Sequence, residues 1–249
     1  MQRDDAGTAP PARPSLRAAF STPESKGRYV RRLFSTIADR YDLITVLLSF
    51  GCDQRWKSRL VSMTGPAHRI RALDLACGTG DITYELVVSG ASVVGLDVTP
   101  RMVELANAKR AQPSNPTFVI GDMMALPFRE ARFDVVTSGY GIRNVSILRP
   151  AIAEIHRVLK PGGLFLSLDF NRPANFVVRA VYLSYLTVVG SVLGFALHRD
   201  PDTYRYIPES IRRYPGAAAV CEIVREEGFR SCEYLPVLGG LMAIHRAVR

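Results

Sequence analysis

Cysteine is scarce in this chain, and the cysteines present lack the spacing that builds covalent or metal cross-links. Cys52, Cys77, Cys221 and Cys232 are the 4 cysteines among 249 residues, and they form no CxxC pair and no Cys/His cluster. Zinc sites and disulfide frameworks depend on such spacing, so the sequence argues against both. We predict a protein without a metal site that works in a reducing cytosol.

The first 25 residues lack the apolar run that a secretory signal requires. They are rich in proline, alanine and arginine, which predicts a disordered tail, and the acidic pair Asp4 and Asp5 argues against an organelle transit peptide. Residues 26–249 are expected to form a single domain, because 47% apolar residues are enough for one sizeable core.

Acidic residues are in the minority. The chain has 32 lysines and arginines against 23 aspartates and glutamates, which gives a formal net charge of +9. This sign favours a polyanionic partner, either nucleic acid or the anionic face of a membrane, or it only keeps the protein soluble. The basic residues are dispersed and no RNA-binding module is visible, so we predict no nucleic-acid partner.

Short apolar runs alternate with helical segments along the middle of the chain. Helices are expected to begin at Asp81, at Pro100 and near Leu148, and strands are expected within RALDLA, SVVGLD, TFVIGD, FDVVTSG and GLFLSLDF. Strands that are apolar on both faces and separated by helices form a parallel sheet covered on both sides. The predicted fold class is α/β, with a doubly wound and mostly parallel sheet.

The two ends of this domain carry different patterns. An amphipathic stripe from Tyr29 to Tyr41 predicts an N-terminal helical cap. Residues 230–248 predict two strands that meet tightly at Gly239 and Gly240 and close the sheet as an antiparallel hairpin.

The first predicted strand runs into ACGTGDI, where Gly78 and Gly80 predict a tight turn that approaches a ligand closely. A dinucleotide site would have a third glycine where Thr83 stands. Asp81 stands at the start of the next helix, where its carboxylate is expected to cap the helix and to repel a diphosphate. The ligand of this loop is therefore expected to carry no phosphate.

Acidic residues end the next two strands. Asp97 ends the second, where a doubly wound fold places the acid that binds both ribose hydroxyls. Asp122 ends the third, and we expect it to read an adenine edge together with the backbone amide of Met123, with Leu126 over the adenine face. An adenosine group without phosphates indicates S-adenosylmethionine, and LKPGG at residues 159–163 makes the combination more specific. We therefore predict a methyltransferase.

The stretch YGIRNV follows the fourth strand and places Arg143 next to Asn144. Ligands of open α/β sheets bind at the carboxyl ends of the strands, so this polar pair is a candidate for substrate chemistry.

Longer segments of the chain resemble the ubiquinone/menaquinone biosynthesis C-methyltransferase family over nearly everything after the tail. GTGD and KPGG occur in many class I methyltransferases, whereas RYD, GIRN and YRYIPESI are particular to this family. The matching segments include VRRLFSTIADRYD (30–42), LDLACGTGD (73–81), FDVVTSGYGIRNV (133–145), RVLKPGG (157–163), YRYIPESIRRYP (204–215) and GGLMAIHR (239–246).

The resemblance implies a class I, Rossmann-like methyltransferase. It also implies transfer of a methyl group from S-adenosylmethionine to a ring carbon of a polyprenylated quinol in respiratory quinone biosynthesis. The acceptor would be demethylmenaquinol, 2-polyprenyl-6-methoxy-1,4-benzoquinol, or both. The sequence does not distinguish between them.

Family contacts and strand ends together give the predicted cofactor-binding residues. The sequence departs from the family at Gly139, where some members have a serine, and at Asp169, where glutamate is usual. The predicted set is Asp74, Gly78, Thr79, Gly80, Asp97, Val98, Asp122, Met123 and Gly139.

The implied chemistry requires ionisation of the acceptor. A neutral aromatic carbon is a poor nucleophile, but loss of a proton from the adjacent hydroxyl makes that carbon enolate-like. Arg143 is predicted to stabilise the developing oxyanion, and Asn144 to orient the ring hydroxyl or a water. The candidate bases are His245, Tyr206, Asp169 or a water held among them.

An uncharged run of eighteen residues spans 180–197 and as a helix would extend roughly 27 Å, the threshold for crossing a bilayer. One crossing would separate the closing hairpin from its sheet. We therefore expect residues 174–214 to form a lid that accepts the polyprenyl tail. Contact with anionic lipid is predicted through Arg31, Arg32, Arg212 and Arg213.

Three alternatives remain open at this point. The chain could methylate another small or lipid-like acceptor, it could act on nucleic acid, or it could be a noncatalytic scaffold that keeps the fold. No cysteine follows the fourth strand, so a covalent route of methylation has no nucleophile there. We expect a cytoplasmic protein at the membrane surface, with a homodimer left open.

Overall fold

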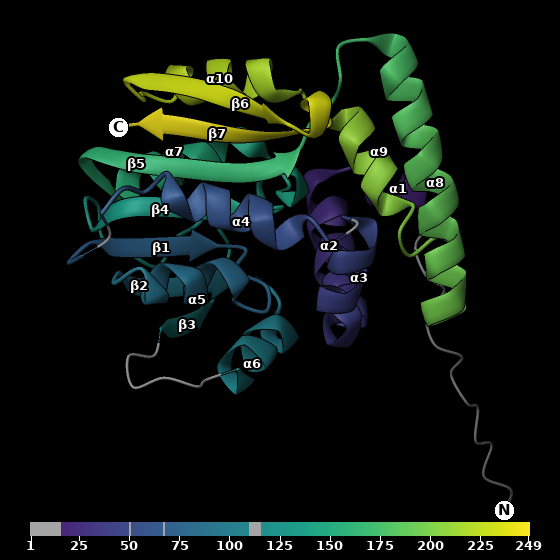
Figure 1. Ribbon diagram of the computed structural model, residues 1–249, viewed down its shortest axis with the longest axis horizontal. Helices are drawn as coiled ribbons and strands as arrows, with labels where there is room; N and C mark the ends of the chain where they lie inside the picture. The colour runs from purple at the N-terminus through teal and green to yellow at the C-terminus, as the bar shows by residue number, and fades with distance from the viewer. Residues whose placement is uncertain (1–15, 50, 67, 110–115) are drawn as a thin grey trace, which may run out of the picture.

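A mixed sheet forms the centre of the molecule in the computed structural model, which describes residues 16–49, 51–66, 68–109 and 116–249. Its seven strands have the order β3-β2-β1-β4-β5-β7-β6 (Figure 1). Strands β1 to β5 pair in parallel, and β7 pairs antiparallel with both β5 and β6. The predicted doubly wound sheet with an antiparallel C-terminal hairpin is confirmed. The strands are β1 (Arg71–Leu75), β2 (Ser92–Asp97), β3 (Thr117–Ile120), β4 (Phe133–Gly139), β5 (Leu159–Phe170), β6 (Ser231–Val237) and β7 (Met242–Val248).

Helices cover both faces of the sheet, because each face is apolar. Helices α4 and α5 pack on one face through Leu60 and Leu86, and α7 and α10 pack on the other through Ile152 and Val224. Burial of such a side chain stabilises the fold by about 1.5–3 kcal/mol. These four helices and α6 beside the β2–β3 edge are α4 (Asp53–Ser62), α5 (Asp81–Val88), α6 (Pro100–Ala108), α7 (Leu148–Val158) and α10 (Ala217–Glu226).

The remaining helices gather beyond the carboxyl ends of the parallel strands (Figure 1). The strand order reverses between β1 and β4, and ligands of such sheets bind outside the carboxyl ends at that reversal. The gathered helices therefore stand over the expected ligand site. They are α1 (Leu16–Ala19), α2 (Pro23–Ile37), η1 (Ala38–Arg40), α3 (Tyr41–Leu48), η2 (Ile142–Asn144), α8 (Phe176–His198) and α9 (Tyr206–Arg213), while η3 (Leu238–Gly240) joins β6 to β7.

Helical structure begins earlier than the sequence predicts, which corrects the expected tail between residues 16 and 25. Helix α2 starts at Pro23, and the hydroxyl of Thr22 accepts a hydrogen bond from the backbone N–H of Ser25. A threonine N-cap followed by proline is a strong helix start that the proline-rich composition obscures. Residues 1–15 of the predicted tail lie outside the described residues.

The apolar run predicted as a lid is part of the 23-residue helix α8. Asn175 caps its first turn by accepting hydrogen bonds from the N–H groups of Val177 and Val178. One side of the helix is packed from Tyr182 to Gly194, and a Cβ added at Gly194 would lie 2.5 Å from the carbonyl oxygen of Asp200. Among the helices of the described residues, only α8 is long and apolar enough to cross a membrane. Its packed side instead attaches it to the domain.

Candidate active site

The loop after β1 and the end of β2 are tied together by one buried carboxylate. Asp97 accepts hydrogen bonds from the backbone N–H of Gly78 (2.9 Å) and of Thr99 (2.8 Å). Burial raises the pKa of Asp97, although these backbone N–H groups oppose the shift. Gly80 has a φ of 91°, a conformation that L side chains rarely adopt, and so the turn needs a glycine. Because it accepts both hydrogen bonds, the Asp97 carboxylate fixes the position at which the loop approaches a ligand.

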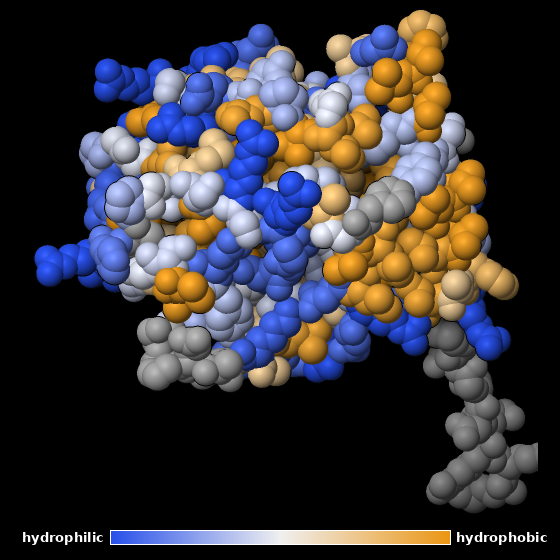
Figure 2. Space-filling view, in the orientation of Figure 1, coloured by the Kyte–Doolittle hydropathy of each residue, from blue (hydrophilic) through white to orange (hydrophobic). Residues whose placement is uncertain are grey.

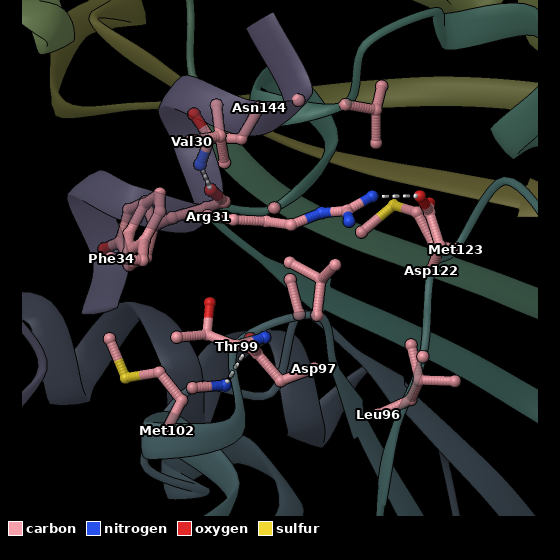
Figure 3. Close-up of a pocket in the computed structure, with 18 of the residues that line it drawn as sticks. Val30, Arg31, Phe34, Leu96, Asp97, Thr99, Met102, Asp122, Met123 and Asn144 are labelled. Carbon is pink, nitrogen blue, oxygen red and sulfur yellow. Dashed lines mark hydrogen bonds and ion pairs between the residues drawn. The ribbon is translucent and has the colours of Figure 1, made fainter. Parts of the chain in front are cut away.

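A cavity lies across the carboxyl ends of β1 to β4 with α2 above it (Figure 3). Its walls combine backbone from the strand ends with apolar side chains from α2 and α6. Six of the nine residues predicted to bind the cofactor line it, namely Gly78, Asp97, Val98, Asp122, Met123 and Gly139.

The other three predicted cofactor residues lie outside this cavity and support the loop. Asp74 is buried and accepts hydrogen bonds from the hydroxyls of Thr83 (2.6 Å) and Thr137 (2.7 Å). Burial raises the pKa of Asp74 to about 6.

The turn itself is supported at Thr79 and Gly80. Thr79 donates its hydroxyl to Asp42 (2.6 Å), and Gly80 lets the chain turn beside Tyr84. These residues support the loop without lining the cavity.

The predicted helix cap by Asp81 is wrong. Gly80 occupies the N-cap position, and the Asp81 carboxylate instead lies 2.8 Å from the Lys57 ammonium and 3.2 Å from that of Lys109. Burial would raise the pKa of Asp81, but the two ammonium groups outweigh it and lower the pKa to about 2. Lys57 comes from α4, so the local sequence around Asp81 could not predict this partner.

The acidic end of β3 faces helix α2. The Asp122 carboxylate accepts a hydrogen bond from the N–H of Met124 and pairs with Arg31 of α2 at 3.4 Å (Figure 3). Met123 lines the cavity, whereas Leu126 is buried in the core and its N–H donates to Glu154. The expectation that Leu126 covers the adenine face is therefore wrong, and Met123 occupies the cavity wall instead.

Gly139 ends β4 and lines the cavity. A Cβ built at this position would lie 2.6 Å from Cδ1 of Ile82, so a serine there would require Ile82 to move. Ile82 can therefore take its observed position because residue 139 is a glycine.

Arg143 and Asn144 of the YGIRNV stretch lie together in η2, and both are buried. The Arg143 Nε lies 3.2 Å from the Asp169 carboxylate, and its Nη1 donates to Ser210 (2.7 Å) and to Asn144 (3.1 Å). The guanidinium also lies 4.9 Å from the centre of the Phe170 ring. These contacts hold Arg143 in one orientation.

Asp169, predicted as a candidate base, is engaged by this arginine. Its carboxylate accepts a hydrogen bond from the backbone N–H of Arg143 (3.0 Å) and of Phe170 (2.8 Å). Burial raises the pKa of Asp169, while the facing Arg143 lowers it. Asp169 lines neither the cavity at the strand ends nor a second, apolar cavity that adjoins it, and its contacts instead hold Arg143 in position.

A second cavity of about 350 Å³ adjoins the first. It is enclosed mainly by apolar and aromatic side chains of α2, α3, α8 and α9, and Arg143 lies in its wall. Tyr140 and Asn144 line both cavities and so stand between them. A reactive group bound in one cavity would therefore lie next to a molecule bound in the other.

Tyr206, another predicted site residue, lines this second cavity. The side chain is buried, its ring stacks on Phe20 and Tyr29 at 5.6 Å, and its hydroxyl has no hydrogen-bond partner among the described residues. Burial raises its pKa well above the usual value, so the hydroxyl is a proton donor at neutral pH. A buried unpaired hydroxyl is costly unless a ligand uses it.

Tyr140 and the residues that support it, Asp53 and Lys57, were not identified from the sequence. Tyr140 has a φ of 59°, which for a residue other than glycine costs about 1–3 kcal/mol. Its hydroxyl donates to Asp53 (2.7 Å), which in turn pairs with Lys57 at 2.5 Å. No local pattern in the sequence indicated this network or the strain at Tyr140.

Lys26 was also missed, and it connects the cap helix to η2. Its ammonium donates to the carbonyl oxygens of Arg143 (3.1 Å) and Val145 (2.5 Å). Burial lowers its pKa to about 8. Helix α2 is thereby held over the residues that face the second cavity.

The structure places the predicted base His245 away from both cavities. Its ring lies between the sheet and α10, where Nε2–H donates to the carbonyl oxygen of Ala217 (3.2 Å) and Nδ1 accepts from the Ser167 hydroxyl (3.2 Å). It lines neither large cavity. The sequence placed His245 on the last strand correctly, but the side chain faces the opposite side of the sheet from Met242, which lines the second cavity.

We expect His245→Gln to keep its turnover and to lose a pH dependence of stability. Burial lowers the pKa of His245 to about 4, so folding favours the neutral ring. Its contribution to stability is therefore complete above pH about 6.5 and is lost as the pH falls toward about 4, by at most roughly 1.4 kcal/mol per pH unit. Urea unfolding of both proteins across this range measures the difference. A folded variant with lost turnover would restore His245 as a base.

Residues 22–249 match the ubiE/COQ5 methyltransferase family. The chain belongs to this family. The "Ubiquinone/menaquinone biosynthesis C-methyltransferase UbiE" of Azotobacter vinelandii is 35% identical over 92% of this chain and 93% of that protein. The protein of the same name from Shewanella oneidensis is 34% identical over 91% of this chain and 92% of its own length.

Solved structures of lower identity share the fold of this family member. A Thermotoga maritima S-adenosylmethionine-dependent methyltransferase, described as a possible histamine N-methyltransferase, aligns with a TM-score of 0.64 at 17% identity, over 88% of this chain and 99% of that one. A chain of the complex between the Haloferax volcanii Trm112 activator and a putative methyltransferase aligns with a TM-score of 0.63 at 19% identity, over 86% and 96%. The predicted class I fold is confirmed.

Membership of the ubiE/COQ5 family makes the chain an S-adenosylmethionine-dependent C-methyltransferase, as the sequence predicted. The first cavity fits this cofactor on chemical grounds. It presents carboxylates from two neighbouring strand ends, Asp97 and Asp122, to the polar edges of an adenosine. The first residue of α5 is the acid Asp81, which disfavours a phosphate at this helix N-terminus. In the described residues, no group of three His, Cys, Asp or Glu side chains could hold a metal ion.

Proposed function

We propose that the protein methylates a ring carbon of a polyprenylated quinol in respiratory quinone biosynthesis, with demethylmenaquinol, 2-polyprenyl-6-methoxy-1,4-benzoquinol, or both as acceptor. The observation that carries this proposal is the apolar cavity of about 350 Å³ with Arg143 and Asn144 in its wall beside the cofactor cavity. An apolar pocket with a few placed polar groups suits a ring with two oxygens and a hydrocarbon tail. The names of the relatives support the same acceptor class.

Arg143 acts electrostatically in this proposal. It stays protonated, so it stabilises the ring oxygen as that oxygen becomes negative and does not remove the proton itself. Asp169 and Ser210 hold the guanidinium before the acceptor arrives, so little reorganisation is needed. When bound, S-adenosylmethionine supplies the methyl group. The residues of the chain ionise the acceptor and keep its ring beside the first cavity.

Asn144 orients the acceptor, and a water takes the proton. The Asn144 amide donates to the carbonyl oxygen of Tyr140 and accepts from Arg143, which leaves one lone pair of its oxygen for a ring hydroxyl or a water. Asp169 is held by Arg143, Tyr206 is a proton donor and His245 lies elsewhere. These contacts support a water beside Asn144 as the base, where the sequence predicted one held among His245, Tyr206 and Asp169.

We expect Tyr206→Phe to lower turnover without weakening the fold. The variant keeps the ring that stacks on Phe20 and Tyr29 and removes only a buried hydroxyl with no partner in the described part of the chain. A hydrogen bond to the acceptor contributes about 0.5–1.5 kcal/mol, so turnover should fall by roughly two- to tenfold. Steady-state kinetics and a thermal melt check both parts, and wild-type kinetics would exclude contact between this hydroxyl and the acceptor.

Methyl-labelled S-adenosylmethionine and two dispersed, reduced acceptors test the proposed function. Demethylmenaquinol and the methoxy-substituted benzoquinol are incubated separately with the purified enzyme, and the product masses are read by chromatography. Label in one or both quinones supports the proposal and identifies the acceptor. Label in neither, with bound cofactor, would mean that the chain methylates another class of acceptor.

Localisation follows from the acceptor. We place the enzyme in the cytoplasm at the membrane surface, because polyprenylated quinols partition into lipid. Of the arginines predicted to bind anionic lipid, Arg31 pairs with Asp122, and Arg212 and Arg213 both pair with Glu209. These ion pairs weaken a docking mode based on charge alone.

A further inference from the structure

We infer that the outer faces of α3 and α8 form a bilayer-docking surface from which the acceptor enters the second cavity. This docking surface is defined by Val181, Val188, Val192 and Phe195 of α8 and by Leu43 and Leu47 of α3. The inference rests on the proposed function, since it concerns the route of a lipid-soluble acceptor. It replaces attraction by arginines with insertion of apolar side chains as the main contact.

The side chains of the docking surface are large, apolar and exposed. On α8, Val181, Val188, Val192 and Phe195 are each 62–66% exposed, and they recur at three, four and seven positions, which places them on one face of the helix. On α3, Leu43 and Leu47 are 52% and 45% exposed. Figure 2 shows the exposed apolar residues gathered on the side of the molecule where α3 and α8 lie. A patch of this kind marks an interaction site.

Helices α3 and α8 contribute to one buried cluster beneath this surface. Ile44 of α3 belongs to the same buried cluster as Tyr204, and Leu193 and Leu197 of α8 pack against that cluster. The two exposed faces are therefore parts of one surface held by a common core.

The mouth of the second cavity opens on this side. Tyr185 of α8 and Leu238 of η3 line the cavity and are also 36% and 54% exposed. Ile44, Thr45 and Leu48 of α3 form a further part of the wall. An apolar tail can therefore pass from the docking surface into the cavity without crossing a polar rim.

The packing of α8 determines how it meets the bilayer. Tyr182, Leu186, Gly190 and Gly194 are buried on its inner side, and no residue from 180 to 197 is charged. A helix attached along one side lies in the interface with its outer face in the acyl region. The GxxxG spacing of Gly190 and Gly194 serves the close approach of residues 200–204, which leaves it buried and away from the docking surface.

A bilayer explains the surface better than a second copy of the chain. A partner seated on α3 and α8 would cover the mouth that Tyr185 and Leu238 share with the surface. A bilayer covers the same side chains and is also the phase that holds the acceptor. Apolar contact and substrate entry then use one face.

Vesicle flotation of the full-length protein tests the inference with a variant and a matched control. The variant carries Val188→Glu and Val192→Glu on the docking surface, and the control carries Val88→Glu on α5, where Val88 is 77% exposed. Neutral phosphatidylcholine vesicles are used with and without added anionic phosphatidylglycerol, at low and high salt. We expect wild type and control to bind neutral vesicles even at high salt, and the variant to bind more than about tenfold more weakly, because two valines no longer enter the acyl region.

Turnover measurements separate this inference from the proposed function. With a tail-less, water-soluble acceptor, wild type, control and variant should react equally. With a long-tailed acceptor embedded in vesicles, only the variant should slow. If wild type fails to methylate the tail-less acceptor and the embedded one, the proposed function is wrong, whatever the vesicles show.

Three results would overturn the inference. The variant could bind neutral vesicles as tightly as the control does. Wild type could bind only anionic vesicles and be released by salt, which would favour docking by charge. Light scattering could show that wild type is a dimer and that the variant is a monomer of the same fold, which would assign the surface to a second copy.

Discussion

Arg143→Lys lowers the turnover number by about 10²- to 10³-fold and leaves the affinity for S-adenosylmethionine unchanged. Arg143 lines the acceptor cavity and not the cofactor cavity, which is why the two quantities separate. Its guanidinium reaches Asp169, Asn144 and Ser210 together. A lysine keeps the charge but lacks this planar fork, so the cation would no longer be fixed beside the acceptor oxygen.

Lysine is the informative substitution because it separates catalysis from folding. Arg143→Ala would leave the buried Asp169 without its cation, at a cost of about 3–5 kcal/mol of stability. Arg246→Lys, on β7 in an exposed pair with Glu233, is the matched control. Turnover from methyl-label transfer and affinity from calorimetry measure the two parts. Wild-type turnover in Arg143→Lys would show that this arginine has no electrostatic role.

Asp97→Asn should reduce the affinity for S-adenosylmethionine by about 10²- to 10⁴-fold, if it loses two hydrogen bonds to ribose hydroxyls worth about 1.5–3 kcal/mol each. The substitution also disturbs the loop, since an amide cannot accept from the N–H groups of Gly78 and Thr99 with both of its ends. Both effects act on the same cavity, because Asp97 lines it and orders its rim.

Asp134→Asn is the control for this prediction. Asp134 stands near the opposite end of β4 and pairs with Lys160 at 2.7 Å, outside the cofactor cavity. Calorimetric titration with S-adenosylmethionine and a thermal melt of each variant separate lost binding from lost folding. Equal affinity of Asp97→Asn and wild type for S-adenosylmethionine would show that the ribose does not bind at this strand end.

The sheet and the strand-end acids were predictable because both follow from local pattern. Apolar runs bounded by glycine and aspartate identified β1 to β5, and the parallel order then placed Asp97 and Asp122 at one edge. Arg143 and Asn144 followed by the same argument. Periodicity and strand order are sufficient where a residue's role depends on which end of a strand it occupies.

Partners distant in the sequence were not predictable. Asp81 begins α5 as expected, but Gly80 is the N-cap and Lys57 of α4 pairs with the Asp81 carboxylate. His245 is on the right strand, yet its side chain meets Ala217 of α10. Successive side chains of β7 point to opposite faces of the sheet, but the sequence does not indicate which face borders the acceptor. Tyr140 gave no signal, because backbone strain depends on the packing around it.

Nuclear magnetic resonance of the isolated product tests the central claim most directly. The purified enzyme, isotopically methyl-labelled S-adenosylmethionine and the reduced acceptor that supports turnover give a product whose labelled methyl is assigned by its chemical shift and couplings. We predict a methyl group on a ring carbon, since Arg143 lines the acceptor cavity and not the cofactor cavity and would hold a ring oxygen away from the latter. A labelled methoxy group would contradict this account, because it would mean that a ring oxygen faces the transferred methyl.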